Sequence, residues 1–291
     1  MTRVQLEVFS LLAELRGFTL VAQRLGISQS AVSHALKSLE TDLGVPLLDR
    51  TTAQIEMTDI GVRLLPRARE VLGLTQTIRQ EADDYLGLRQ GSLRIGSFGP
   101  TSTLVLLPPI LEKFHQNYPD IEVHIDEGSD ADVVQWIQQR QVDLGFVVLD
   151  DERFETYPLL EDQLVALVPG SGELADHDQI ELSELCQHRF IMTEAGSSPL
   201  IERLFSDAGL VPTISSRTSQ VLSTMALVAR DEGVAIVAES AIPQMVEMPG
   251  LAIRPLSPRH HRRVGLALLD SNKATPAARA FIEIAQQSHR R

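Results

Sequence analysis

The sequence has one cysteine, Cys186, and no long apolar run. A single cysteine excludes an internal disulfide and any zinc site built from several cysteines. Because no stretch of about 18 apolar residues occurs, no segment is predicted to span a bilayer. The segment Met1–Glu7 ends in a carboxylate where a signal peptide would need an apolar core. We therefore expect a cytoplasmic protein that contacts no membrane and holds no metal.

Basic residues are also scarce. Lysine and arginine number 26 against 39 aspartate and glutamate residues, so the 291-residue chain carries a net charge of −13. Proteins that bind polyanions usually present a basic surface, and whole-chain charge therefore ranks nucleic acid low among the partners. Hydrophobic residues make up 43% of the chain, and its length suffices for more than one core.

Residues 1–60 predict three short helices followed by a small β-wing. Apolar residues recur at helical spacing in Val4–Leu15. Thr19 is expected to cap a second helix and Ser28 a third. The third helix is expected to end at Gly44, where a glycine can adopt the left-handed conformation. Alternating apolar residues in Thr51–Thr58 then predict the wing.

A single long helix is predicted for residues 61–87. Its apolar residues are spaced seven, three, four and seven apart, as in a coiled-coil seam: Leu64, Val71, Leu74, Ile78 and Tyr85. Such a seam on a long helix favours a homodimer formed through this linker. A helix that packs on its own domain is the alternative.

From Gly91 onward, strands and helices alternate, which predicts an α/β domain covering residues 88–291. Two similar lobes fit this order, one of about residues 91–161 plus 266–291 and the other of 162–265. The strands are expected at Ser92–Gly96, Ile121–Ile125, Asp143–Val148, Leu164–Val168, Phe190–Met192, Val234–Val237 and Val264–Leu269.

The third predicted helix has two unlike faces. Val32, Leu36 and Leu39 lie on an apolar stripe, whereas the opposite face carries Ser30, Ser33, His34 and Lys37. Short polar side chains without bulky apolar groups suit a helix that enters the major groove of DNA. The helix N-terminus also offers free N–H groups to phosphate. A solvated surface helix is the alternative.

The run Phe18–Ser33, continued by Leu36, Leu39-Glu40, Leu43-Gly44, Leu47, Arg50, Thr58 and Gly61, resembles the LysR-type transcriptional regulators. The resemblance implies a winged helix-turn-helix domain, a dimerising linker helix and a two-lobed regulatory domain like the periplasmic binding proteins. It implies double-stranded operator DNA and a small-molecule effector as partners, and a homotetramer as the assembly. With the helix pattern, it predicts DNA contact for Thr19, Ser28, Gln29, Ser30, Ser33, His34, Lys37 and Arg50.

The wing departs from the family pattern. Ala53 and Gln54 stand where one or two arginines are usual, and Leu48 replaces a phenylalanine. Arginines in the minor groove add phosphate attraction. Residues 1–60 also carry five basic and seven acidic residues, a net charge of −2. We therefore expect weak wing contacts, a modest salt dependence and reliance on oligomeric avidity.

Three strand-to-helix loops are candidates for the effector site: Ser97–Thr103, Gly128-Ser129 and Thr193–Pro199. Ligands in open α/β sheets bind beyond the carboxyl ends of the strands. Because helix N-termini favour anions, an anionic metabolite is predicted, although Glu194 limits the negative charge that the site can accept. Thr101 and Ser102 could instead cap a helix, and Phe146 could belong to the core. Effector contact is predicted for Pro100, Thr101, Ser102, Gly128, Ser129, Phe146, Thr193, Gly196, Ser197 and Val221.

Two other functions are alternatives to regulation. A periplasmic-type binding protein without a DNA role would have an export signal and no helix-turn-helix. An enzyme would need a nucleophile elbow, a P-loop or a dinucleotide fingerprint, and none is found, so no catalysis and no cofactor are predicted. The basic run Arg259–Arg263 is interpreted as a solvated crossover segment. Redox sensing by Cys186 is disfavoured because the chain has no second thiol.

Overall fold

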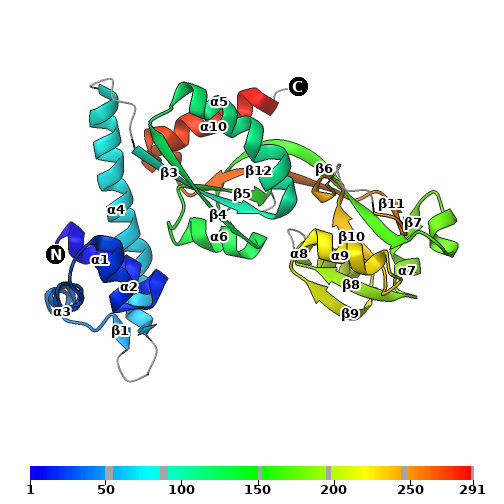
Figure 1. Ribbon diagram of the computed structural model, residues 1–291, viewed down its shortest axis with the longest axis horizontal. Coiled ribbons are helices and arrows are strands. Elements are labelled where there is room, and N and C mark those ends of the chain that lie inside the picture. Colours follow the sequence, from blue (N-terminus) through cyan, green and yellow to red (C-terminus); the bar gives the residue numbers. More distant parts are fainter. Residues whose placement is uncertain (50–54, 86–90, 150–152, 195–197, 244–247, 290–291) are drawn as a thin grey trace. The chain divides into compact units, whose positions relative to one another are not determined.

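The computed structural model describes residues 1–49, 55–85, 91–149, 153–194, 198–243 and 248–289 (Figure 1). The chain forms two compact bodies. One contains residues 1–90 together with the short segments 138–141 and 272–276, and the other contains the rest. Across the described ranges, every helix is too short or too polar to cross a membrane.

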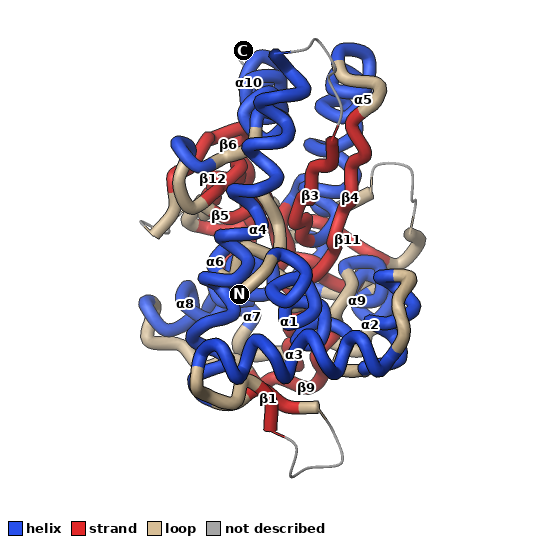
Figure 2. Tube along the Cα trace, turned by 90° about the vertical axis from the view of Figure 1, so that its left-hand side faces the viewer, coloured by secondary structure: helices blue, strands red, loops and turns tan. Residues whose placement is uncertain are grey.

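Three helices form the N-terminal domain, as predicted: α1 (Arg3–Leu15), α2 (Phe18–Leu25) and α3 (Gln29–Leu43). Figure 2 shows them gathered together, with the wing strand β1 projecting from the group. The prediction that Thr19 caps α2 is wrong. The helix begins at Phe18 with Gly17 at the cap position, so Thr19 lies in the first turn and is exposed.

The core of this domain draws on all three helices and the start of the wing. Leu48, the departure from the family pattern, is 3% exposed and packs in the same cluster. The smaller side chain is therefore accommodated as a core residue. The fully buried or nearly buried members are Leu6, Val8, Phe9, Leu12, Val21, Ala22, Val32, Leu36, Leu39, Leu47, Leu48, Leu65 and Ala68.

The wing is a two-stranded antiparallel sheet of β1 (Leu48–Asp49) and β2 (Glu56–Met57). Its tip, residues 50–54, lies outside the described residues. The predicted DNA contact of Arg50 and the expectations for Ala53 and Gln54 fall in that segment.

Only Thr58 separates the second wing strand from the linker helix α4 (Asp59–Tyr85). Thr58 fixes this junction: its Oγ1 donates to the carbonyl of Pro46 at 2.8 Å and accepts from the N–H of Gly61 at 3.1 Å. Gly61 is required there, because a Cβ would lie 2.2 Å from the carbonyl oxygen of Leu47. The Thr58 and Gly61 positions of the motif thus have a structural reason.

The regulatory body is built on a sheet with the order β4-β3-β5-β12-β6-β11-β7. Strands β4 (Ile121–Gly128), β3 (Gly91–Phe98) and β5 (Leu144–Val148) run parallel, whereas β12 (His261–Leu268) is antiparallel to β5 and to β6 (Glu155–Pro169). In Figure 1, β6 and β12 run from one lobe toward the other. The three parallel strands fit the predicted α/β domain, and the crossover strands β6 and β12 add the antiparallel part.

The first lobe contains strands β3, β4 and β5. Its helices are α5 (Leu107–Asn117), which continues a π-helical segment at Thr101–Leu106, α6 (Asp130–Gln138) and α10 (Pro276–His289). Figure 1 shows α5 and α10 on one face of the sheet and α6 on the other.

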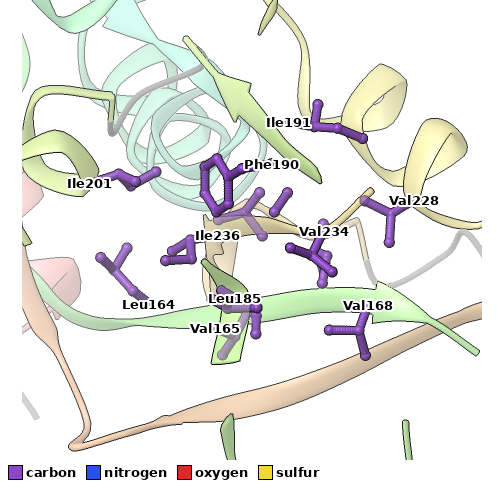
Figure 3. Packing of buried hydrophobic residues seen from close by; sticks show 14 of the residues in the cluster. Leu164, Val165, Val168, Leu185, Phe190, Ile191, Ile201, Val228, Val234 and Ile236 are labelled. Carbon is purple, nitrogen blue, oxygen red and sulfur yellow. The ribbon is translucent and has the colours of Figure 1, made fainter. Parts of the chain in front are cut away.

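The second lobe combines the C-terminal part of β6 with a separate pair of strands. Its core gathers Leu164, Val165, Phe190, Ile201 and Ile236 from different elements (Figure 3). Its elements are β7 (Ile180–Glu181), α7 (Leu182–Leu185), β8 (Arg189–Thr193), α8 (Ser198–Asp207), β9 (Thr213–Thr218), α9 (Val221–Val228), β10 (Ala235–Ala238) and β11 (Leu251–Ser257), with short 3₁₀ turns at Glu173–Asp176 and Glu239–Ala241 and a third, outside this lobe, at Ser271–Lys273.

The structure corrects three expectations in this body. Strand β6 is 15 residues long, not confined to Leu164–Val168, because its first half pairs with β12. Strands β7, β9 and β11 are not among the strands predicted from the sequence. The basic run 259–263 is not wholly solvated, because Arg262 is 4% exposed and lies inside β12.

Candidate functional site

The first candidate site is the polar face of α3. Val32, Leu36 and Leu39 are fully buried. The predicted contact residues on the opposite side are all exposed: Ser28, Gln29, Ser30, Ser33, His34 and Lys37. The structure therefore brings six of the eight predicted DNA-contact residues onto one accessible surface at the N-terminal half of one helix, with Thr19 exposed on the preceding helix. We name these six residues the recognition face.

Ser28 starts the helix that carries this face. Its backbone is extended, and its Oγ accepts from the N–H of Ala31 at 3.1 Å. The same oxygen lies 2.9 Å from Oγ of Ser30. Ser28 therefore satisfies one of the otherwise unbonded N–H groups of the first turn while its hydroxyl stays at the surface.

Glu40 is the carboxylate nearest the recognition face along α3, and it is engaged elsewhere. Its Oε1 accepts from the backbone N–H of Leu47 at 2.8 Å and of Leu48 at 3.3 Å. The side chain thus anchors the first wing strand to the helix. The glutamate of the motif therefore has a structural role, and its charge is bonded to backbone N–H groups of the protein.

The second candidate site is a cleft of about 600 Å³ in the regulatory body. Four predicted effector residues line it: Pro100, Gly128, Ser129 and Val221. They come from the ends of β3 and β4 and the start of α9, so loops of both lobes meet at this cleft. Its full described lining is Gly99, Pro100, Thr103, Leu104, Glu127, Gly128, Ser129, Asp132, Glu194, Ser219, Gln220, Val221 and Leu222.

Four other predicted effector residues lie in the interior instead. Phe146 is fully buried, and Thr193 is 1% exposed. Ser102 is fully buried, and its Oγ accepts from the N–H of Phe98 at 2.9 Å and contacts the hydroxyl of Ser97 at the same distance. Thr101 is 1% exposed. These side chains are engaged within the protein and do not line the cleft. Gly196 and Ser197 lie outside the described residues.

Sequence reasoning missed the loop that precedes α9. Ser219, Gln220 and Leu222 line the cleft together with Val221. This loop could not be predicted because the strand before it, β9, is exposed and mostly polar. Its sequence lacks the apolar alternation of a half-buried strand. Recognising a strand at Thr213–Thr218 would have marked residues 219–222 as a further strand-to-helix loop.

The charges at the cleft do not favour an anionic effector, which stays a prediction. Its lining contains Glu127, Asp132 and Glu194 and, among the residues that the structure describes, no lysine or arginine. Arg217 approaches Glu194, but at 3.9 Å and with both side chains half exposed. Such a contact offsets little charge. The prediction rests on the helix N-termini and already allows for Glu194, and Glu127 and Asp132 add two further carboxylates at the cleft.

Ser129 and Asp132 close the N-terminus of α6 at the same cleft. Asp132 Oδ2 accepts from the Ser129 N–H at 2.9 Å and from its Oγ at 2.6 Å, while Ser129 Oγ accepts from the Asp132 N–H at 3.2 Å. This reciprocal arrangement satisfies the helix end internally. An anion would therefore find this terminus already occupied by a carboxylate.

Two carboxyl groups of the first lobe have a raised pKa: Asp130, the residue after Ser129, and Asp143, the residue before β5. Burial raises the pKa of Asp130 to about 6, although the positive charge of Arg262 opposes the change. Burial likewise raises the pKa of Asp143 to about 6, opposed by a hydrogen bond from the Arg94 backbone and by the Arg94 charge. Within the described ranges, no group of three or more histidine, cysteine or acidic side chains is placed to hold a metal ion.

Comparison with known proteins identifies the family. Residues 4–62 match the family model of the bacterial regulatory helix-turn-helix proteins of the lysR family, and residues 86–290 match that of the LysR substrate binding domain. The HTH-type transcriptional regulator YvbU of Bacillus subtilis is 31% identical over 99% of this chain and 98% of its own. The chain belongs to the LysR family. It is a DNA-binding transcriptional regulator with an effector-binding domain.

Solved structures of LysR-family members share the fold over the whole chain. Full-length OxyR from Pseudomonas aeruginosa, a cysteine-to-aspartate variant, has a TM-score of 0.76 at 23% identity and covers 100% of this chain and 95% of its own. Full-length CbnR in complex with target DNA has a TM-score of 0.63 at 22% identity, with 99% and 100% covered. The predicted order of a winged helix-turn-helix, a linker helix and a two-lobed domain is confirmed.

Proposed function

We propose that this LysR-family regulator reads operator DNA with the recognition face of α3 inserted into the major groove. The observation that carries the proposal is the exposure of Ser30, Ser33, His34 and Lys37 on the side of α3 opposite its buried stripe. Hydroxyl, imidazole and ammonium groups can donate to or accept from base edges, and their small bulk lets the helix approach closely. Action at operator DNA places the protein in the cytoplasm.

Dimerisation through α4 is part of the proposal. Val71, Leu74 and Ile78 belong to the predicted seam and are 42%, 38% and 65% exposed in the single chain. A second copy of α4 would cover these apolar side chains in the manner of a coiled coil. Because residues 1–60 have a net charge of −2, we infer that joining several recognition helices, in a dimer and then a tetramer, supplies affinity that phosphate contacts alone do not.

The effector that we propose for the cleft is a small molecule that is neutral or positively charged. A volume of about 600 Å³ falls in the range of small-ligand sites. The carboxylates of Glu127, Asp132 and Glu194 attract an ammonium group and repel a carboxylate or phosphate. The apolar side chains of Leu104, Val221 and Leu222 provide contacts for a hydrocarbon part.

Selection from a pool of randomised duplexes tests the DNA part of the proposal. Full-length protein should enrich a sequence with two related half-sites, because a symmetric dimer presents two copies of α3. Recovery of no common sequence, at low and at moderate salt, would contradict a specific operator-binding role.

A thermal-shift screen tests the effector part. Matched sets of primary amines, polyols and carboxylates are added to the full-length chain, and a ligand that binds the folded state raises Tm. We expect stabilising compounds among the amines or polyols, with the shift reduced in the Glu127→Gln variant. Stabilisation by carboxylates alone would refute the proposed charge preference and leave the DNA-binding proposal intact.

A further inference from the structure

A buried ion pair lies where the two crossover strands pass between the lobes. Asp162 is on β6 and Arg262 is on β12, and their side chains are only 4% and 1% exposed. Oδ2 of Asp162 accepts from Nη2 of Arg262 at 2.9 Å and from Nε at 3.0 Å. The guanidinium also lies over the ring of Phe98, the last residue of β3, at 5.9 Å from its centroid.

Each lobe adds one hydroxyl group to this pair. Thr101 begins the π-helical segment of the first lobe, directly after Pro100 at the cleft, and its Oγ1 accepts from Nη2 of Arg262 at 2.6 Å. Ser240, in the short turn after β10 of the second lobe, donates to Oδ2 of Asp162 at 2.5 Å. The two hydroxyl oxygens are 2.8 Å apart. Residues distant in sequence therefore meet at a single point between the lobes.

The hydrogen-bond directions around these four groups agree with one another. Arg262 donates to Thr101, and Ser240 uses its hydroxyl proton to donate to Asp162. The remaining contact is then a donation from Thr101 to Ser240, and the ion pair closes the ring. Hydrogen bonds that run in one direction along a chain polarise one another, so each bond becomes stronger. We name Asp162, Arg262, Thr101 and Ser240 the interlobe ring.

The interlobe ring is not explained by a gain in folding stability. Taking a carboxylate and a guanidinium out of water costs several kcal/mol per ion, and apolar residues of similar size often stabilise a protein as well or better. A ring with fixed directions instead specifies one arrangement of the groups that form it. Because its members come from both crossover strands and from both lobes, that arrangement includes the angle between the lobes.

We propose that the interlobe ring sets the angle between the lobes and couples it to the cleft through Thr101. Asp162 and Arg262 are then positioning residues for the effector site, and Ser240 is the second-lobe end of the connection. Effector contact with Pro100 or Thr103 displaces Thr101 relative to Arg262, so the ring changes between discrete states and the lobes move with it. This inference rests on the proposed function of the cleft.

Distance measurements between the lobes in the full-length protein test this inference. With Cys186 replaced by serine, nitroxide labels are attached to cysteines introduced at the exposed positions Lys113 in α5 and Ser206 in α8. Pulsed electron paramagnetic resonance then gives the distance distribution without any ligand. Thr101→Val and Ser240→Ala each remove a ring hydroxyl and keep the volume nearly unchanged, and each is expected to broaden the distribution or add a second distance.

Ser102→Ala is the matched control. It removes an equally buried hydroxyl from the same segment, but one that bonds only within the first lobe. It should lower Tm without changing the distance. Distributions identical to wild type in both ring variants, with the folded state verified by circular dichroism, would overturn the inference. The thermal-shift screen is run in parallel on the same proteins, so failure of the ring is distinguished from failure of the proposed effector site.

Discussion

Ser28 offers a pair of substitutions that separates the folding of α3 from contact with DNA. Its Oγ accepts from the Ala31 N–H at 3.1 Å at the start of the helix. Ser28→Ala removes this cap and should lower the free energy of unfolding by about 1 kcal/mol. Ser28→Asp replaces it with a cap of equal rank whose negative charge suits the helix N-terminus, so stability should stay within a few tenths of a kcal/mol of wild type.

The aspartate should nevertheless weaken DNA binding. If the start of α3 faces phosphate groups, the new carboxylate repels them by about 1 kcal/mol at 4 Å in bulk water and by about 4 kcal/mol at an effective dielectric constant of 20. Since about 1.4 kcal/mol corresponds to a factor of ten, Kd should rise between about 5-fold and about 1,000-fold. The rise should shrink as salt is added, because the charges are exposed.

Urea unfolding and fluorescence anisotropy with the selected duplex measure the two effects separately. Thr2 provides the control, because it caps α1 through Gln5 in the same domain. Thr2→Ala and Thr2→Asp should reproduce the stability pattern and leave Kd unchanged. A Ser28→Asp protein that binds the duplex as tightly as wild type would refute the placement of the α3 N-terminus at the DNA.

Three further predictions test other parts of the structure. Ile78→Asp puts a charge on a seam residue that is 65% exposed, and sedimentation should show smaller assemblies than wild type; an unchanged assembly would exclude α4 as the dimer contact. Burial raises the pKa of Asp143 from 3.8 to about 6, so the folded state binds the carboxyl proton more tightly than the unfolded state does. The contribution of Asp143 to stability therefore falls as pH rises from about 4 to about 6, by at most about 3 kcal/mol. Asp143→Asn should flatten that part of the stability profile in urea unfolding at several pH values, and an equally steep profile would contradict the assignment. Gly61→Ala would place a Cβ 2.2 Å from the carbonyl oxygen of Leu47 and should lower stability by more than about 3 kcal/mol, whereas Gly73→Ala in the same helix meets nothing within 4 Å and should be neutral or stabilising by about 1 kcal/mol.

Local patterns determined what could be predicted at the DNA-binding end. The two faces of α3 follow directly from a 3.6-residue period, because burial of Val32 and Leu36 leaves Ser33 and Lys37 outside. The start of α2 was misplaced because Thr19 is a good capping type, yet the chain turns at Gly17 and the helix begins at Phe18. Residue preferences predict that a helix exists more reliably than they predict the residue at which it begins.

Contacts between distant residues limited what could be predicted at the cleft. Arg262 looked solvated because its sequence neighbours are basic, but its partner Asp162 lies 100 residues away on another strand. Thr101 was expected at the effector for its place after a strand, and it bonds instead to Arg262. The anionic effector is predicted from helix ends with Glu194 as the opposing charge, and the structure adds the carboxylates of Glu127 and Asp132 to the lining of the cleft. Single-sequence patterns carry no such pairing information.

Binding of the selected duplex by the Ser33→Ala/Lys37→Ala double variant tests the central claim most directly. Full-length protein is used, and Ser206→Ala/Arg203→Ala, which changes an exposed hydroxyl and an exposed cation on α8, is the matched control. If each recognition-face contact contributes about 1–3 kcal/mol, Kd should rise at least about 30-fold in the double variant and stay unchanged in the control. A double variant that remains folded and retains the duplex within about threefold of wild-type affinity would contradict the recognition face as the DNA-reading surface.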